Sequence, residues 1–143
     1  MLEDLRDLVW IIDPSHDALG SLVAKMRSAA DALLGDRCRF VVDDALPLGD
    51  LSMRRRRELL MIYKELVHNV ARHAGPSAVE ISLASGPDGL VLQVADEWVG
   101  FDSRQPASGH GLGSIRARAK RLGGELHIES SPGQGTRATL VVP

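Results

Sequence analysis

Apolar residues recur at helical spacing in two long segments of the first half of the chain. The first segment covers about residues 17–34 and ends at Gly35. The second covers about residues 53–74, begins after Ser52 as its N-cap and ends at Gly75-Pro76. Its apolar positions at i, i+4, i+7 and i+11 predict a buried stripe made of Leu59, Tyr63, Leu66 and Val70.

The remaining apolar runs are shorter and predict strands at residues 38–42, 78–84, 90–95, 125–129 and 137–142. Residues 85–89 are turn formers, so the second and third strands should form a hairpin. A third helix is expected over about residues 112–122, ending at Gly123-Gly124. Helices that alternate with mostly hairpin-linked strands predict an α+β fold. This fold is a two-layer sandwich with a mixed, mostly antiparallel sheet covered on one face by about three helices.

Residues 1–13 carry a different pattern from the rest of the chain. Leu2, Leu5, Val9 and Ile12 are spaced three, four and three apart, which is the seam of a coiled coil. So short a helix is not stable alone in water. The segment is either the tail of a longer helix stopped by Pro14 or an amphipathic helix packed on its own domain. The spacing does not decide between the two.

Composition adds few constraints. A chain of 143 residues is long enough for one domain with a substantial core. The net charge of -2 gives no reason to expect a nucleic-acid or membrane partner. The single cysteine, Cys38, excludes an intrachain disulfide and fits a reducing cytosol. The chain has no apolar run near the ~20 residues of a membrane span and no signal peptide at its start.

One face of the second helix carries Glu65, Asn69, Arg72 and His73, at i, i+4, i+7 and i+8. A solvated polar face is the ordinary explanation. However, asparagine is a weak helix former in a helix interior, and its amide oxygen is a hard ligand suited to Mg²⁺. A transition-metal site using Glu65, His68 and His73 is the alternative. It is disfavoured because His68 lies about 100° around the helix from Asn69 and the chain has no second Glu-x-x-His or cysteine pair.

Three later segments combine glycine with polar residues. Asp96 follows an apolar strand, and a carboxylate there can accept a hydrogen bond from an adenine amine. The segment Gly109-His110-Gly111-Leu112-Gly113 opens onto the third helix and offers free N–H groups to an anion. Thr136 follows Gly133-Gln134-Gly135 in a hairpin turn. Residues 99–110 have little apolar content and no period, which predicts a mobile loop. Each signal is weak alone.

In order, these segments resemble the ATP-binding domain of sensor histidine kinases, a branch of the gyrase, chaperone and mismatch-repair ATPase superfamily used in two-component signalling. The matching runs are residues 65–74, 96–102, 109–113 and 133–136, and the resemblance covers roughly residues 14–143. It implies a Bergerat-type fold that binds Mg-ATP. Residues 1–13 would then be the end of a dimerisation helix.

The resemblance also implies roles for single residues. Asn69 would hold Mg²⁺, and Glu65 would orient a metal-bound water or assist proton removal as the catalytic residue. Arg72, where the family usually has lysine, and His73 would face the phosphates. Further nucleotide contacts would come from Asp96, Gly100, Gly109, Gly111, Leu112 and Gly113. Thr136 would help to position the phosphate side of the pocket.

The implied activity is that of a protein-histidine kinase, with the γ-phosphate of ATP presented to a histidine on a separate dimerisation domain of the same protein. A response regulator would receive the phosphoryl group later. None of the histidines at 16, 68, 73, 110 and 127 carries the charged signature of a phospho-acceptor. We therefore expect a cytoplasmic, monomeric fragment that binds nucleotide without phosphorylating itself, from a homodimeric parent compatible with membrane anchoring. A serine-directed kinase of the same fold and a docking module without catalysis are the alternatives.

Two arginine-rich segments complete the candidates. Four consecutive arginines, at 54–57, point all round a helix axis and lack interleaved aromatics, so a solvated helix start is the better interpretation than a nucleic-acid patch. The basic residues of the third helix are either a solvated face or contacts to phosphate or a partner. They are Arg116, Arg118, Lys120 and Arg121.

Trp98 departs from the family pattern Asp-x-Gly-x-Gly, because it stands where the first glycine belongs. Stacking of an indole on adenine would favour binding by about 1 kcal/mol, and the strain of a backbone at positive φ would cost about the same. These energies alone therefore do not decide whether Trp98 strengthens or weakens ATP binding. We expect pocket shape to matter more, and predict that Trp98 weakens ATP binding. Trp98→Gly should tighten Mg-ATP binding in calorimetry, and a clear loss of affinity would instead make the indole part of the base-binding surface.

Overall fold

The computed structural model describes Leu5 and residues 19–43, 46, 52–73, 78–96, 112–130 and 135–143. Its helices are α2 (Leu19–Leu34), α3 (Met53–His73) and α4 (Leu112–Arg121), with a 3-10 turn at Gly35–Arg37. Its strands are β1 (Cys38–Val42), β2 (Val79–Gly86), β3 (Gly89–Asp96), β4 (Glu125–Ser130) and β5 (Thr136–Val142). The three helices and five strands predicted after residue 14 all form, with ends shifted by at most two residues.

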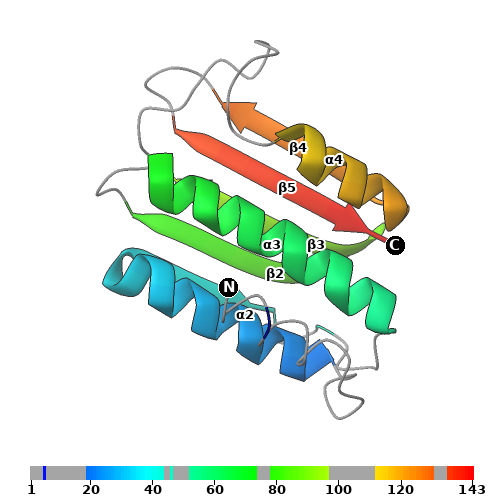
Figure 1. Ribbon diagram of the computed structural model, residues 1–143, viewed down its shortest axis with the longest axis horizontal. Coiled ribbons are helices and arrows are strands. Elements are labelled where there is room, and N and C mark those ends of the chain that lie inside the picture. Colours follow the sequence, from blue (N-terminus) through cyan, green and yellow to red (C-terminus); the bar gives the residue numbers. More distant parts are fainter. Residues whose placement is uncertain are drawn as a thin grey trace.

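The molecule has two layers. The strands form one sheet in the order β1-β2-β3-β5-β4, in which β1 and β2 are parallel and the other neighbours antiparallel. Helices α2, α3 and α4 all lie on the same face of this sheet (Figure 1). The predicted α+β sandwich with a mixed, mostly antiparallel sheet is therefore confirmed.

The core lies between the helices and the sheet. Ile81, Leu92 and Leu140, on three neighbouring strands, are at most 1% exposed. The predicted stripe of α3 is confirmed, since Leu59, Tyr63, Leu66 and Val70 are all buried. The Tyr63 hydroxyl donates to the Met26 carbonyl at 2.7 Å and so joins α3 to α2. Burial, followed by the nearby Cys38 and Asp31, raises the pKa of Tyr63 above its ordinary value.

Local signals place the ends of the helices. The Ser52 hydroxyl accepts a hydrogen bond from the Arg55 backbone N–H at 3.2 Å, so Ser52 is the predicted N-cap of α3. Helix α4 ends where Gly123 takes a φ of +72° and the Gly124 N–H bonds the Ala119 carbonyl. The bond from Gly124 gives a hydrogen-bond partner to one of the carbonyls that have none within the last turn of a helix.

The arginine run of α3 is only in part the solvated helix start that we predicted, because Arg54 and Arg57 are exposed but the run also makes contacts within the fold. Arg56 is 1% exposed, Arg54 donates to the Arg121 carbonyl at 2.7 Å, and Arg55 donates to the Pro143 carbonyl. The physical reason is tertiary: this end of α3 packs beside the end of α4 and the end of the chain. The carbonyls there, which lack partners within their own elements, accept from the guanidinium groups.

A buried carboxylate joins α3 to α4. The Glu58 side chain is 2% exposed and lies 3.3 Å from both the Arg57 and the Arg118 guanidinium nitrogens. Arg116 donates to the Leu126 carbonyl at 3.1 Å. Two of the α4 arginines that could have contacted phosphate or a partner are thus bonded within the fold.

Three sequence-based hypotheses fall mostly or wholly outside the described residues. They are the dimerisation helix at 1–13, of which only Leu5 is described, the effect of Trp98 and the loop at 99–110. Among the helices that are described, none combines the length and apolar character needed to cross a membrane.

Candidate functional site

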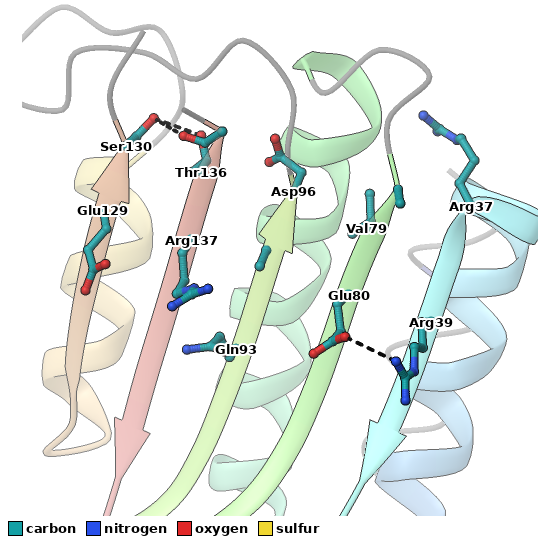
Figure 2. A pocket seen from close by; sticks show the side chains of 13 residues that line it. Arg37, Arg39, Val79, Glu80, Gln93, Asp96, Glu129, Ser130, Thr136 and Arg137 are labelled. Carbon is teal, nitrogen blue, oxygen red and sulfur yellow. Dashed lines mark hydrogen bonds and ion pairs between the residues drawn. The ribbon is translucent and has the colours of Figure 1, made fainter. Parts of the chain in front are cut away.

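The sheet register brings the ends of several strands together at one end of the molecule. Asp96, the last residue of β3, is the register partner of Thr136 at the start of β5 and of Val79 at the start of β2. Ser130, at the end of β4, pairs with Thr136 from the other side. Figure 2 shows Asp96, Thr136 and Ser130 at adjacent strand ends, which we call the Asp96 end of the sheet.

Asp96 and Thr136 belong to the set of side chains that faces the helices. Alternate residues of a strand point to the same face of the sheet. Val94 and Ala138, two residues from Asp96 and Thr136 respectively, are both buried in the core. Asp96 and Thr136 therefore lie at the rim of the interlayer space, where a ligand could meet residues from both layers.

Helix α3 carries its polar residues toward this same end. Arg54 and Arg55 tie the start of α3 to the end of α4 and to Pro143, just beyond β5, at the far end of the sheet. A helix of 21 residues is about 30 Å long, enough to span the layer. The final turns of α3 thus lie at the Asp96 end, as the ribbon shows (Figure 1). Asn69 and Arg72 belong to these turns.

The predicted polar face of α3 exists. Glu65 and Arg72 are exposed, and Asn69, between them, is half-buried beside the buried Val70. His73 is the last residue of the helix. Within the described ranges, no group of three or more His, Cys, Asp or Glu side chains is placed to hold a metal. Among the described side chains of this face, the oxygen ligands suited to a metal are the Glu65 carboxylate and the Asn69 amide.

The first turn of α4 points toward the Asp96 end, because its last turn is joined to the start of α3 at the opposite end. Its first residues are Leu112 and the exposed Gly113, and its first turn contains no acidic residue. The N–H groups of that turn, at the positive end of the helix dipole, suit an anion. The last turn of α4 carries the basic residues Arg118, Lys120 and Arg121, whose positive charges are favourable at the negative end of the helix dipole.

Thr136 has a close polar neighbour. The Ser130 hydroxyl lies 2.9 Å from the Thr136 hydroxyl and donates to the Gly135 carbonyl at 3.0 Å. Gly135 is buried and takes a φ of +76°, a conformation that favours glycine. Ser130 lies just after the strand predicted at 125–129 and is not among the residues predicted to form the site. The signal that could have identified it was its position directly opposite Thr136 across the predicted hairpin.

A hollow of about 870 Å³ lies on the other face of the sheet. Its lining on that face comes from Arg39, Glu80, Gln93, Ala95, Glu129 and Arg137 (Figure 2). The Arg39 and Glu80 side chains approach to 3.9 Å and are mostly exposed. This hollow reaches the Asp96 end at Asp96, Ser130 and Thr136, but α3, which carries Asn69, and α4 lie on the other face of the sheet. It is therefore not the site predicted from the motifs.

The structure brings together Asn69, Arg72, Asp96, Thr136 and the start of α4 at one end of the molecule. Glu65 lies one helical turn from Asn69, toward the middle of α3. Three predicted nucleotide-binding residues, Gly100, Gly109 and Gly111, lie outside the described residues, as do the side chains of His73 and Leu112.

Comparison with known proteins gives consistent matches. A family profile described as histidine kinase-, DNA gyrase B-, and HSP90-like ATPase matches residues 55–143. The nitrate/nitrite sensor protein NarQ of Escherichia coli (strain K12) is 30% identical over 122 residues, 83% of this chain and 22% of that protein. The sensor protein VraS of Staphylococcus aureus (strain COL) is 33% identical over 86 residues, 59% of this chain and 25% of that protein. The chain spans about a quarter of the length of these relatives or less.

Solved structures of low sequence identity share the fold. The catalytic domain of the histidine kinase ThkA superposes with a TM-score of 0.69 at 15% identity, over 87% of this chain and 91% of that one. The blue-light activated histidine kinase of Erythrobacter litoralis EL346 gives a TM-score of 0.66 at 19% identity, over 88% of this chain and 45% of that one. Because the profile match covers more than half of its 143 residues, the chain belongs to the histidine kinase-, DNA gyrase B- and HSP90-like ATPase family, as an ATP-binding domain of the sensor histidine kinase type.

Proposed function

We propose that this chain binds Mg-ATP and presents its γ-phosphate to a histidine on a separate dimerisation domain of a sensor kinase. The observation that carries the proposal is the register pairing of Asp96 with Thr136 on the helix-facing side of the sheet. Asn69 and the start of α4 lie at the same end. Because the register puts Thr136 beside Asp96, we assign Thr136 to the base end of the site and not to the phosphate side. We expect this pair, Asn69 and the start of α4 to contact one nucleotide.

The adenine end of the site would be Asp96. An ionised carboxylate only accepts hydrogen bonds, and the exocyclic amine of adenine donates them. Guanine has a carbonyl oxygen at that position, so GTP would place two acceptors against each other. Asp96 should therefore select ATP over GTP.

The phosphate end would lie between α3 and α4. The donor set fits Mg²⁺, because this ion takes oxygen ligands and keeps waters and substrate phosphates in most of its positions. Asn69 would supply the protein ligand, and Glu65 would orient a metal-bound water or assist proton removal. Arg72, His73 and the N–H groups of Gly111, Leu112 and Gly113 would hold the phosphates. When bound, Mg²⁺ neutralises charge on the transferred phosphoryl group.

The chemistry that remains for this chain is positioning and electrostatics. A nitrogen of the acceptor imidazole would form a bond to the γ-phosphorus while the bond to the β–γ bridging oxygen breaks, leaving ADP on this chain. The acceptor histidine, and the response regulator that later receives the phosphoryl group, would belong to other domains.

Calorimetric titration of the chain with Mg-ATP and with Mg-GTP tests the binding part of the proposal. We expect saturable binding of Mg-ATP and at least about tenfold weaker binding of Mg-GTP. Incubation with radiolabelled ATP and a separately supplied dimerisation domain tests transfer. Binding without transfer would favour a nucleotide-dependent docking module, for which Trp98 is the supporting sequence feature. Transfer to serine would make the chain a serine-directed kinase of the same fold.

Residues 99–112 are predicted to be a lid that nucleotide orders. The sequence of this span is rich in glycine and polar residues and offers few apolar side chains for a core, and the phosphates of a bound nucleotide would supply hydrogen-bond partners. Hydrogen exchange should show increased protection of peptides from this span when Mg-ATP is added. Peptides from the turn end of the β2–β3 hairpin, residues 84–91, lie away from Asp96, so they serve as the internal control and should not change. Unchanged protection at 99–112 under saturating nucleotide would contradict the lid assignment.

A further inference from the structure

We infer that Ser130 is a positioning residue that fixes the direction of the Thr136 hydroxyl at the nucleotide site. The inference rests on the proposed function, because it concerns the base-binding end of the same site. Ser130 and Thr136 close the β4–β5 hairpin as register partners, with their hydroxyl oxygens 2.9 Å apart.

Counting protons sets the direction of the hydrogen bonds. A serine hydroxyl has one proton, and a carbonyl oxygen can only accept. The Ser130 proton is therefore used in the 3.0 Å bond to the Gly135 carbonyl. The 2.9 Å contact between the two hydroxyls must then use the Thr136 proton, with Ser130 as acceptor.

This direction decides what Thr136 offers to a ligand. With its proton held by Ser130, the Thr136 oxygen presents only lone pairs to the helix-facing side of the sheet. Asp96, its register partner on the neighbouring strand, also presents acceptors when ionised. Two adjacent acceptors suit an amino group, which has two N–H donors, or a water bridging to it. Ser130 would thus strengthen the preference for adenine through Thr136 without itself touching the base.

The bond to Gly135 has a second effect. It fixes the carbonyl of the residue directly before Thr136, where the backbone takes a φ of +76°. The orientation of the peptide that leads into Thr136 is thereby set by the same serine. One side chain controls both the backbone and the hydroxyl of its neighbour.

Loss of the Ser130 hydroxyl should reduce the preference of the site for Mg-ATP over Mg-GTP. In Ser130→Ala the Thr136 proton is free to turn toward the ligand, where it repels an amine and accommodates a carbonyl. We expect the ratio of Mg-ATP to Mg-GTP affinity, measured by calorimetry, to fall about three- to tenfold, the range for one hydrogen bond. Ser130→Thr keeps a hydroxyl and should restore most of the ratio. Ser130→Cys, whose thiol is a weak hydrogen-bond partner, should lower the affinity ratio as Ser130→Ala does. It replaces the alanine variant in the test if that variant does not fold.

A double-mutant cycle separates positioning from a merely structural role. In a Thr136→Val background, Ser130→Ala should leave the ratio unchanged, because the hydroxyl through which Ser130 acts is gone. Two results would contradict the inference about Ser130 but not the proposed function. One is an equal loss of affinity for both nucleotides in Ser130→Ala, and the other is the same fall in the ratio of Mg-ATP to Mg-GTP affinity with and without the Thr136 hydroxyl. If the unmutated chain bound no Mg-ATP, the proposed function would fail and the inference with it.

Discussion

Replacing Glu58 with alanine is expected to lower the free energy of unfolding by about 3 kcal/mol, as for a broken buried ion pair. The Glu58 carboxylate is 2% exposed and accepts from Arg57 and Arg118, so its loss leaves guanidinium groups at the α3–α4 contact without their acceptor. The value lies at the low end of the usual range because Arg118 is 30% exposed and can regain some hydration. Urea unfolding followed by circular dichroism measures the change.

Glu80→Ala is the matched control. It removes a glutamate from an ion pair of 3.9 Å in which both side chains are mostly exposed. Exposed pairs contribute about 0–1 kcal/mol, so this variant should unfold close to the unmutated chain. Equal destabilisation by the two alanine substitutions would contradict the special role given to burial at Glu58.

Asn69→Asp is expected to weaken Mg-nucleotide binding by at least about tenfold, while unfolding changes little. The substitution keeps the size of the side chain but adds a negative charge at the end of α3, where we propose that the triphosphate lies. Repulsion between this charge and the phosphates opposes binding, and the half-buried position limits screening by solvent. Calorimetry with Mg-ATP measures the loss.

Ala24→Asp controls for the change in net charge. Ala24 is exposed on α2, so an added carboxylate there should leave nucleotide affinity unchanged. Circular dichroism establishes that both variants are folded. Equal affinity in the unmutated chain and folded Asn69→Asp would remove Asn69 from the site.

The fold could be predicted from sequence because its main elements carry local signals. The stripe from Leu59 to Val70 specifies which face of α3 is buried, and Ser52 specifies where the helix begins. The turn at residues 87–88 lies inside the segment predicted to join the hairpin strands. These signals act over a few residues, so periodicity and turn chemistry detect them.

The polar contacts that were missed depend on tertiary neighbours. Four arginines around a helix axis are solvated only if nothing packs there, and periodicity cannot show that α4 and the chain end cover this part of α3. Glu58 likewise acquires its role from Arg118, which lies 60 positions later. Local sequence patterns carry no information about such pairs.

The candidate site was predictable in part. Asn69, Asp96 and Thr136 were singled out by residue type and order, and the structure places them at the same end of the molecule. The partnership of Ser130 with Thr136 required the strand register, which the hairpin pattern implies but does not fix. Roles for Gly100, Gly109 and Gly111 remain predictions, because these residues lie outside the described ranges.

The parallel pairing of β1 with β2 has a consequence for how the domain opens. Four strands are linked to one another through antiparallel ladders, whereas β1 is an edge strand that joins the sheet through five register pairs with β2. Helix α2 and β1 are consecutive in the chain and lie together at one side of the sheet (Figure 1). They form the natural unit for sub-global unfolding. Such an event would expose the side of α3 that carries Tyr63 while leaving the pairing of Asp96 with Thr136 intact.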